Sequence, residues 1–141
     1  MSDKITAGPG PAPESTLEQL QKLRRRLLDL HKTLLEIERA AYEQAHGRVS
    51  SGELLQLILG HEQFAWLRPI SELVVRIDEM LDADDPMTVE DAESLFSQTR
   101  SLLTPSETGS AFEQRYYAAL QGDPHAVLAH REVTLLLSAS A

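Results

Sequence analysis

The sequence predicts an all-α protein, an antiparallel helical bundle built on a long two-helix hairpin with two or three shorter helices. Three observations lead to this prediction. Apolar residues recur in steps of three and four over long stretches, which is the spacing that one buried helix face requires. No run alternates strictly between apolar and polar side chains, as a half-buried strand does. The connections between the predicted helices are short, and short connections favour antiparallel neighbours.

The composition is typical of a single soluble domain with its own core, because the 141 residues are 42% hydrophobic and 25% charged. The formal net charge of −9 argues against binding to nucleic acid or to anionic lipid. The absence of cysteine excludes disulfides, thiolate metal sites and cysteine nucleophiles. No apolar run approaches the ~18 residues of a membrane span, and the N-terminus does not lead into a signal-peptide core. We therefore expect a cytoplasmic protein.

The chain divides into an N-terminal arm and one folded domain. Residues 1–14 contain three prolines and two glycines, and Ile5 is their only large aliphatic residue. Such a segment buries too little apolar surface to offset the entropy lost on ordering. We predict a disordered arm over residues 1–14 and a helical-bundle domain over residues 15–141.

The first long helix is expected over residues 16–46. Ser15 and Glu18 have the spacing of a capping box, and Gly47 supplies a left-handed stop. A second, shorter apolar row makes the buried face wide, as a bundle helix requires. The main row consists of Leu20, Leu23, Leu27, Leu30, Leu34, Ile37 and Ala41, and the second of Leu28, Leu35 and Tyr42.

The second long helix is expected to begin with a capping box of Ser50 and Glu53 and to run to about Leu81. Gly60 and Pro69 interrupt this helix. Pro69 predicts a kink or a break near residues 66–69, because proline removes an amide hydrogen bond and clashes with the preceding turn. Before Gly60 the helix is apolar nearly all round and must be covered on two sides. The residues responsible are Leu54, Leu55, Leu57, Ile58 and Leu59.

Three shorter helices are expected to lie across the open face of the hairpin. Thr88 caps the first of them. Pro105 suits the first turn of the second, which ends at Gly122. Asp123 and Pro124 open the third. The apolar side of the second is formed by Phe112, Tyr116, Ala119 and Leu120, and that of the third by Val127, Leu128, Val133, Leu136 and Leu137.

The stretch GRVSSGELLQLILGHEQFAWLRPISELVVRIDE, residues 47–79, resembles a family of small uncharacterised bacterial helical proteins. The resemblance extends through LLTPSETGSAFEQRYYAAL, residues 102–120. It implies a bacterial origin and an independent helical domain. It implies no activity, cofactor or functional residue.

A metal site is one candidate for chemistry. Glu43 and His46 are three residues apart, the spacing that carboxylate-bridged di-iron bundles use to place two ligands on one helix face. Such a site needs a second pair of this kind, whereas His61 and Glu62 are adjacent and point in different directions. His46 also suits the negative end of the helix dipole. We favour the dipole interpretation and predict no cofactor.

A row of polar residues, Arg24, His31 and Glu38, falls between the two apolar rows of the first helix. Charged residues rarely occupy such positions unless they are paired. Three interpretations remain open. The residues lie at the edge of the face, or they form a buried polar network with Gln56 or Gln63, or His31 and Glu38 exchange a proton in a ligand or catalytic site.

Charge is unevenly distributed along the chain. Residues 77–99 hold eight acidic residues and no lysine or arginine. In an antiparallel hairpin this segment lies at the same end as a basic cluster on the first helix, so either the two neutralise each other or one faces a partner protein. The basic cluster consists of Lys22, Arg24, Arg25, Arg26 and Lys32.

A second apolar surface is predicted on the second helix, where Leu54, Leu57, His61 and Phe64 lie off the main face. Either self-association or a partner protein covers it, or the shorter helices do. We predict a non-enzymatic, cytoplasmic interaction or regulatory module, most simply a homodimer. The alternative is a bundle that binds a metal or a small ligand, including a carboxylate/histidine metalloenzyme.

Overall fold

The computed structural model describes residues 10–139, and all regular elements in this range are helices. The prediction of an all-α bundle is therefore confirmed. The elements are α1 (Glu14–His46), α2 (Ser51–Gly60), α3 (Glu62–Ala65), α4 (Arg68–Asp82), α5 (Val89–Leu102), α6 (Ala111–Gly122) and α7 (Pro124–Ala139).

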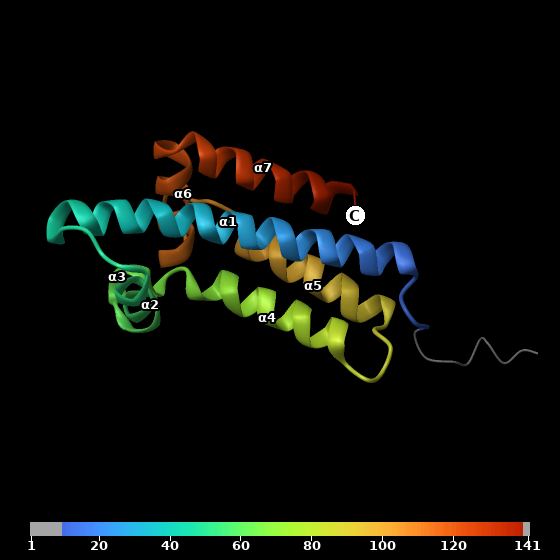
Figure 1. Ribbon diagram of the computed structural model, residues 1–141. Coiled ribbons are helices and arrows are strands. Elements are labelled where there is room, and N and C mark those ends of the chain that lie inside the picture. Colours follow the sequence, from blue (N-terminus) through green and yellow to red (C-terminus); the bar gives the residue numbers. More distant parts are fainter. Residues whose placement is uncertain (1–9, 140–141) are drawn as a thin grey trace, which may run out of the picture.

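The longest helix, α1, is the centre of the bundle and packs mainly on α7 and α4 (Figure 1). Both of these helices run antiparallel to α1, whereas α5 runs parallel to it. The short helices α2 and α3 lie beside the start of α4, and α6 leads into α7 at the same end of the molecule. The hairpin partner of α1 is thus α4 together with α3, and α7 is a second antiparallel neighbour.

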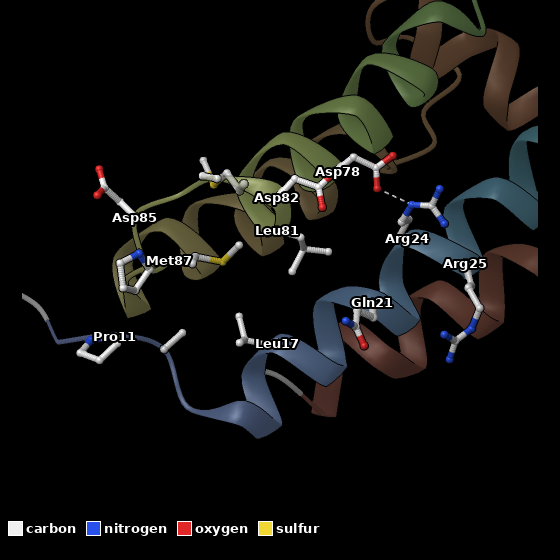
Figure 2. Close-up of a pocket in the computed structure, with 14 residues that line it drawn as sticks. Pro11, Leu17, Gln21, Arg24, Arg25, Asp78, Leu81, Asp82, Asp85 and Met87 are labelled. Atoms are coloured by element: carbon white, nitrogen blue, oxygen red, sulfur yellow. Dashed lines mark hydrogen bonds and ion pairs between the residues drawn. The ribbon is translucent and has the colours of Figure 1, made fainter.

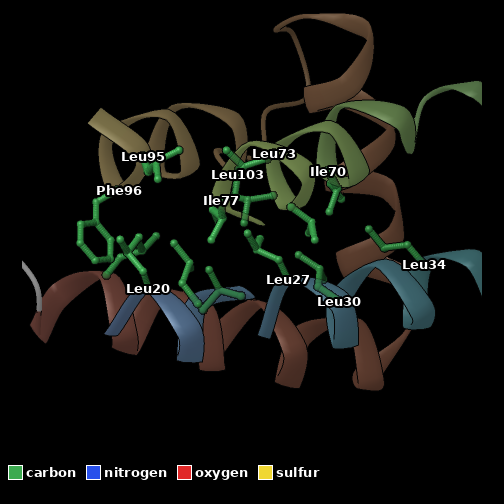
Figure 3. Packing of buried hydrophobic residues seen from close by; sticks show 14 of the residues in the cluster. Leu20, Leu27, Leu30, Leu34, Ile70, Leu73, Ile77, Leu95, Phe96 and Leu103 are labelled. Atoms are coloured by element: carbon green, nitrogen blue, oxygen red, sulfur yellow. The ribbon is translucent and has the colours of Figure 1, made fainter. Parts of the chain in front are cut away.

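The core is built on the leucine row of α1. Leu20, Leu23, Leu27, Leu30 and Leu34 are completely buried. They face apolar side chains of α4 and α5, including Ile70, Leu73, Ile77, Leu95 and Phe96 (Figure 3). The predicted row is confirmed as far as Leu34. Ile37 is half-buried and Ala41 is exposed, because the last turns of α1 extend beyond the packed part of the bundle.

The start of α1 differs from the prediction. The helix begins at Glu14, its N-cap is Pro13, and Ser15 lies inside the first turn without capping it. The backbone N–H of Ala12 donates to the carbonyl of Met87 at 2.7 Å, so the chain before α1 is hydrogen-bonded to the α4–α5 connection. This tertiary contact fixes the entry to α1. The prediction of a disordered arm is wrong for residues 10–14, and the rest of that arm, residues 1–9, lies outside the described residues.

The second arm of the hairpin is interrupted by two breaks. A break at the predicted place is confirmed, because α4 begins at Arg68 with Pro69 in its first turn. The second break lies at His61, whose extended backbone ends α2 and whose Nδ1 accepts a hydrogen bond from the Gln63 N–H at the start of α3. This break directly follows Gly60, one of the two residues expected to interrupt the helix. Gly47, with a φ of 88°, turns the chain after α1 as predicted.

The caps of α5 and α7 are confirmed at Thr88 and Asp123. Pro105 does not begin a helix, because a capping box of Ser110 and Glu113 starts α6 five residues later in the chain. The predicted apolar row of α7 is partly wrong. Val127 and Leu128 are exposed, since packing against α1 selects a neighbouring face. That buried face consists of Ala126, Val133 and Leu137.

Candidate functional site

Helix α2 is apolar and has no buried residue. Leu55 and Leu59 are 55% and 66% exposed, and Leu54, Leu57 and Ile58 are only half-buried. The helix packs mainly on the short helix α3. The sequence predicts that this segment is covered on two sides, whereas the fold covers only one. We call the exposed side of α2, carrying Leu55 and Leu59, the α2 face.

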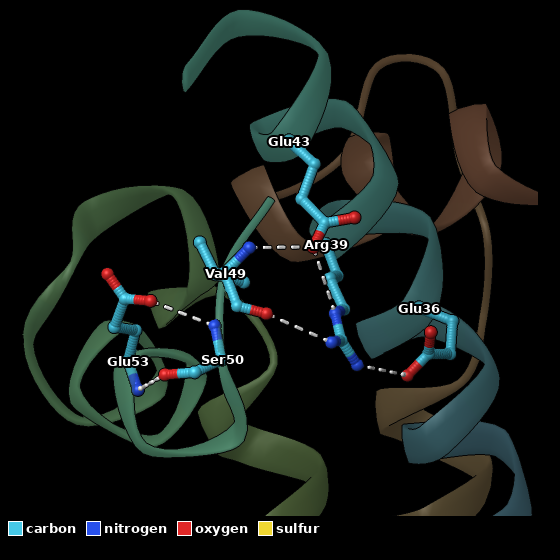
Figure 4. Close-up of polar contacts among 6 residues, drawn as sticks. All are labelled: Glu36, Arg39, Glu43, Val49, Ser50 and Glu53. Carbon is cyan, nitrogen blue, oxygen red and sulfur yellow. Dashed lines mark hydrogen bonds and ion pairs between the residues drawn. The ribbon is translucent and has the colours of Figure 1, made fainter. Parts of the chain in front are cut away.

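The connection that places α2 is held by polar contacts to α1 (Figure 4). Arg39 Nη2 donates to the Val49 carbonyl at 3.2 Å, and the Val49 N–H donates to Glu43 Oε2 at 2.9 Å. Arg39 also lies 3.4 Å from Glu43. The hydrogen bond from Val49, followed by the nearby Arg39, lowers the pKa of Glu43. Because both polar backbone groups of Val49 are bound, the start of α2 is fixed relative to α1.

The capping box at the start of α2 is confirmed. The Ser50 N–H donates to Glu53 Oε1 at 2.9 Å, and the Glu53 N–H donates to Ser50 Oγ at 3.2 Å. These hydrogen bonds lower the pKa of Glu53. Glu53 is the only charged side chain of α2, so its carboxylate stays at the first turn and the rest of the helix surface is uncharged.

Of the residues of the predicted interaction surface, Phe64 is buried, Leu54 and Leu57 are half-buried and His61 is exposed. Phe64 is only 2% exposed and lies near the rings of Tyr42 and His61. Leu57 and Phe64 are seven residues apart, but the break at His61 separates α2 from α3, so the two residues do not continue one helix face. The exposed apolar residues nearby are Leu55 and Leu59.

The candidate metal ligands are not brought together. Glu43 is bound to Arg39 and Val49, and His46 stacks on Tyr42, with ring centroids 4.2 Å apart. His61 caps α3, and Glu62 is exposed. Across residues 10–139, no group of three or more histidine, aspartate or glutamate side chains is placed to hold a metal ion.

The polar row of α1 ties α1 to the other arm of the hairpin at two points. Arg24 forms an ion pair with Asp78 of α4. Glu38, whose side chain is only 13% exposed, accepts hydrogen bonds from Trp66 Nε1 at 2.9 Å and Gln63 Nε2 at 3.0 Å. Its carboxylate also lies 3.6 Å from Arg115 of α6. Gln63, one of the two amides expected near this row, is therefore a partner of Glu38.

His31 lies on α1 between Arg24 and Glu38 and is half-buried. The hydrogen bonds of the described residues do not join it to Arg24 or to Glu38, so the geometry does not assemble a proton-exchanging pair of His31 and Glu38. Burial lowers the pKa of His31. Arg24 and Glu38 thus set the register of α1 against the other arm of the hairpin, and the partly buried imidazole of His31 lies between them.

The basic and acidic clusters do meet at one end of the bundle. Arg24 and Arg25 of α1 line a cavity of about 520 Å³ together with Asp78, Asp82 and Asp85 (Figure 2). Arg26, next along α1, instead faces Glu132 of α7 at 3.7 Å. Neutralisation within the fold accounts for at least part of the charge pattern, and such exposed pairs contribute only ~0–1 kcal/mol each.

One pair of functional groups was not predicted. The hydroxyl of Tyr116 lies 2.6 Å from Nδ1 of His130. Burial raises the pKa of Tyr116 and lowers that of His130. A sequence signal existed, because residues 126, 130, 133 and 137 follow the helical spacing of a single face of α7. The signal was obscured by the more apolar Val127 and Leu128 next to it.

Comparison with models of known families, with curated proteins and with solved structures finds no match for this chain. Within the described part of the chain, the helices are too short or too polar to cross a membrane.

The half-buried His31 predicts how stability depends on pH. A lowered pKa means that the folded state favours neutral His31, whereas the unfolded chain takes up a proton near the ordinary value of 6.5. The free energy of unfolding should therefore decrease as the pH falls below about 6.5. Urea unfolding between about pH 7.5 and 5.5 measures this slope. His31→Gln should make the slope shallower, and an unchanged slope would contradict the assignment.

Proposed function

We propose that this protein is a non-enzymatic, cytoplasmic interaction module that forms a homodimer through the α2 face. The observation that supports the proposal is the ten-residue apolar helix α2, in which no residue is buried. Fully burying a leucine side chain contributes ~1.5–3 kcal/mol. A fold that leaves Leu55 and Leu59 in water therefore retains a substantial driving force for association.

The charge distribution of α2 permits a second copy as the occupant. A chain with a net charge of −9 repels copies of itself, so self-association requires a contact that adds little like charge. The α2 face meets this requirement, because the only charge of α2 is Glu53, held in the capping box. In a two-fold arrangement the same patch serves both subunits, so Leu55 and Leu59 of one copy pack against those of the other.

The conformation of α2 also supports a preformed interface. The contacts of Arg39 and Glu43 with Val49 hold the start of α2 before any partner binds. A fixed helix loses less conformational entropy on association than a flexible segment does. At Gly60 no heavy atom other than those of the local helix backbone and the adjacent residues lies within 4 Å of the position of a Cβ atom, so the end of the helix is open to close approach.

Sedimentation velocity of the full chain tests the proposal. The wild-type protein should sediment as a dimer, and the double variant Leu55→Asp, Leu59→Asp as a monomer, because dimer formation would bury four carboxylates. The matched control is Val127→Asp, Leu128→Asp, which changes exposed apolar residues of α7 and should remain dimeric. Circular dichroism verifies that both variants are folded. A monomeric wild-type protein, or a dimer that survives the α2 substitutions, would contradict the proposal.

A further inference from the structure

A cavity of about 370 Å³ lies between the end of α5, the segment that follows it, and α7. Its apolar lining includes Leu103 and Leu137, each less than a tenth exposed, and Pro105. Arg100 and His130, whose side chains carry nitrogen donors, also line it. Small-molecule sites are clefts of ~300–1,000 Å³ with mainly apolar walls and a few polar groups, and this cavity has that composition.

The Tyr116 contact sets the tautomer of His130. Tyr116 is completely buried and its hydroxyl must find a hydrogen-bond acceptor, because an unsatisfied buried donor costs about 1–3 kcal/mol. His130 Nδ1, at 2.6 Å, is the acceptor available to it. A neutral imidazole that accepts at Nδ1 carries its proton on Nε2. His130 therefore carries an N–H donor on the ring edge opposite Tyr116, and the residue lines the cavity.

Arg100 supplies the charge of this cavity. Its Nη2 donates to the Leu137 carbonyl at 3.2 Å, which anchors the guanidinium beside α7. A guanidinium has five N–H donors, so further donors remain for a ligand. No aspartate or glutamate lines the cavity, although the chain as a whole carries a net charge of −9. The cavity is thus a local positive, apolar site on an acidic protein.

We propose that this cavity binds a small ligand with an apolar body and one carboxylate. The carboxylate pairs with Arg100 and accepts a hydrogen bond from Nε2 of His130, and the apolar body contacts Leu103 and Leu137. Guanidinium–carboxylate pairs are charge-assisted and directional, which favours a carboxylate over a neutral head group. The site is separate from the α2 face, so its test does not depend on dimer formation.

Isothermal titration calorimetry with octanoate tests the proposal, and 1-octanol, which has the same chain length without a carboxylate, is the matched probe. Octanoate should bind the full-length protein saturably, and 1-octanol should bind about tenfold more weakly or not at all. In methyl and histidine NMR spectra, octanoate should shift the signals of Leu103, Leu137 and His130 Nε2 and leave those of Leu55 unchanged. Absence of saturable binding, equal binding of both probes, or shifts confined to other regions would overturn the proposal.

Two variants locate the contribution of charge. Arg100→Gln keeps an N–H donor for the Leu137 carbonyl but removes the positive charge, and it should weaken octanoate binding by about tenfold. The control Arg76→Gln removes a charge from α4, where Arg76 bonds Gln98 and lines a different cavity, and it should bind octanoate like the wild type. Equal affinity of the two variants would overturn the role of Arg100. If Arg100→Gln fails to fold, the NMR shifts of the wild-type protein decide the question.

Discussion

Replacing Leu27 with alanine should lower the free energy of unfolding by about 3 kcal/mol. Leu27 is completely buried in the middle of α1 and belongs to the main apolar cluster, alongside residues of α4, α5 and α7. The substitution removes the transfer free energy of the side chain and leaves a cavity that close-packed neighbours fill only in part. Urea unfolding followed by far-UV circular dichroism measures the change.

The neighbouring residue provides the control. Leu28 is also a leucine of α1, but it is 40% exposed. Leu28→Ala should cost less than about 1 kcal/mol, because the side chain is already partly hydrated in the folded state. If Leu27→Ala and Leu28→Ala lower the free energy of unfolding equally, the buried face of α1 is oriented differently from the one described.

Replacing Glu38 with alanine should lower the free energy of unfolding by about 2 kcal/mol. Its carboxylate accepts the hydrogen bonds of Trp66 Nε1 and Gln63 Nε2 at a position that is only 13% exposed. Without the Glu38 carboxylate, the donors of Trp66 and Gln63 stay partly buried and lose this acceptor. Leaving a buried donor unsatisfied costs more free energy than a hydrogen bond contributes net. Trp66 is the only tryptophan of the chain, so its fluorescence reports both the unfolding transition and the altered surroundings of the indole.

Two other substitutions separate the hydrogen bonds of Glu38 from its charge. Glu38→Gln keeps an acceptor oxygen for Trp66 and should lose less stability than Glu38→Ala. Glu36→Ala removes an exposed carboxylate two residues away, which lies 3.8 Å from Arg39, and should change the free energy of unfolding by less than about 1 kcal/mol. If Glu38→Ala and Glu36→Ala are equally stable, Glu38 does not tie α1 to the other arm of the hairpin.

The sequence predicted the helices well where local chemistry decides them. The capping boxes at Ser50 and Thr88 form as expected, since each requires only residues three positions apart. The cap at Ser15 failed because residues 10–12 are bound to the α4–α5 connection, which moves the start of α1. A capping motif thus predicts the start of a helix unless hydrogen bonds from a distant segment fix the same stretch of backbone.

The candidate site was predicted only in part. The polar row of α1 stands out in the sequence, because charged residues between two apolar rows are unusual in any helix. Its partners Asp78 and Trp66 depend on the register of the opposite arm, which spacing alone does not give. The pair of Tyr116 and His130 was missed because the two residues belong to different helices, and their contact exists only after α6 and α7 pack together.

Consecutive residues are enough to predict the helical class, the leucine face of α1 and the apolar character of α2, because helical period and side-chain polarity are local properties of the chain. Two other outcomes come from the tertiary structure: α2 remains uncovered, and α7 buries Ala126 rather than Val127. These outcomes depend on which distant segments become neighbours. The free energy of their packing then selects among faces that the local pattern leaves nearly equivalent.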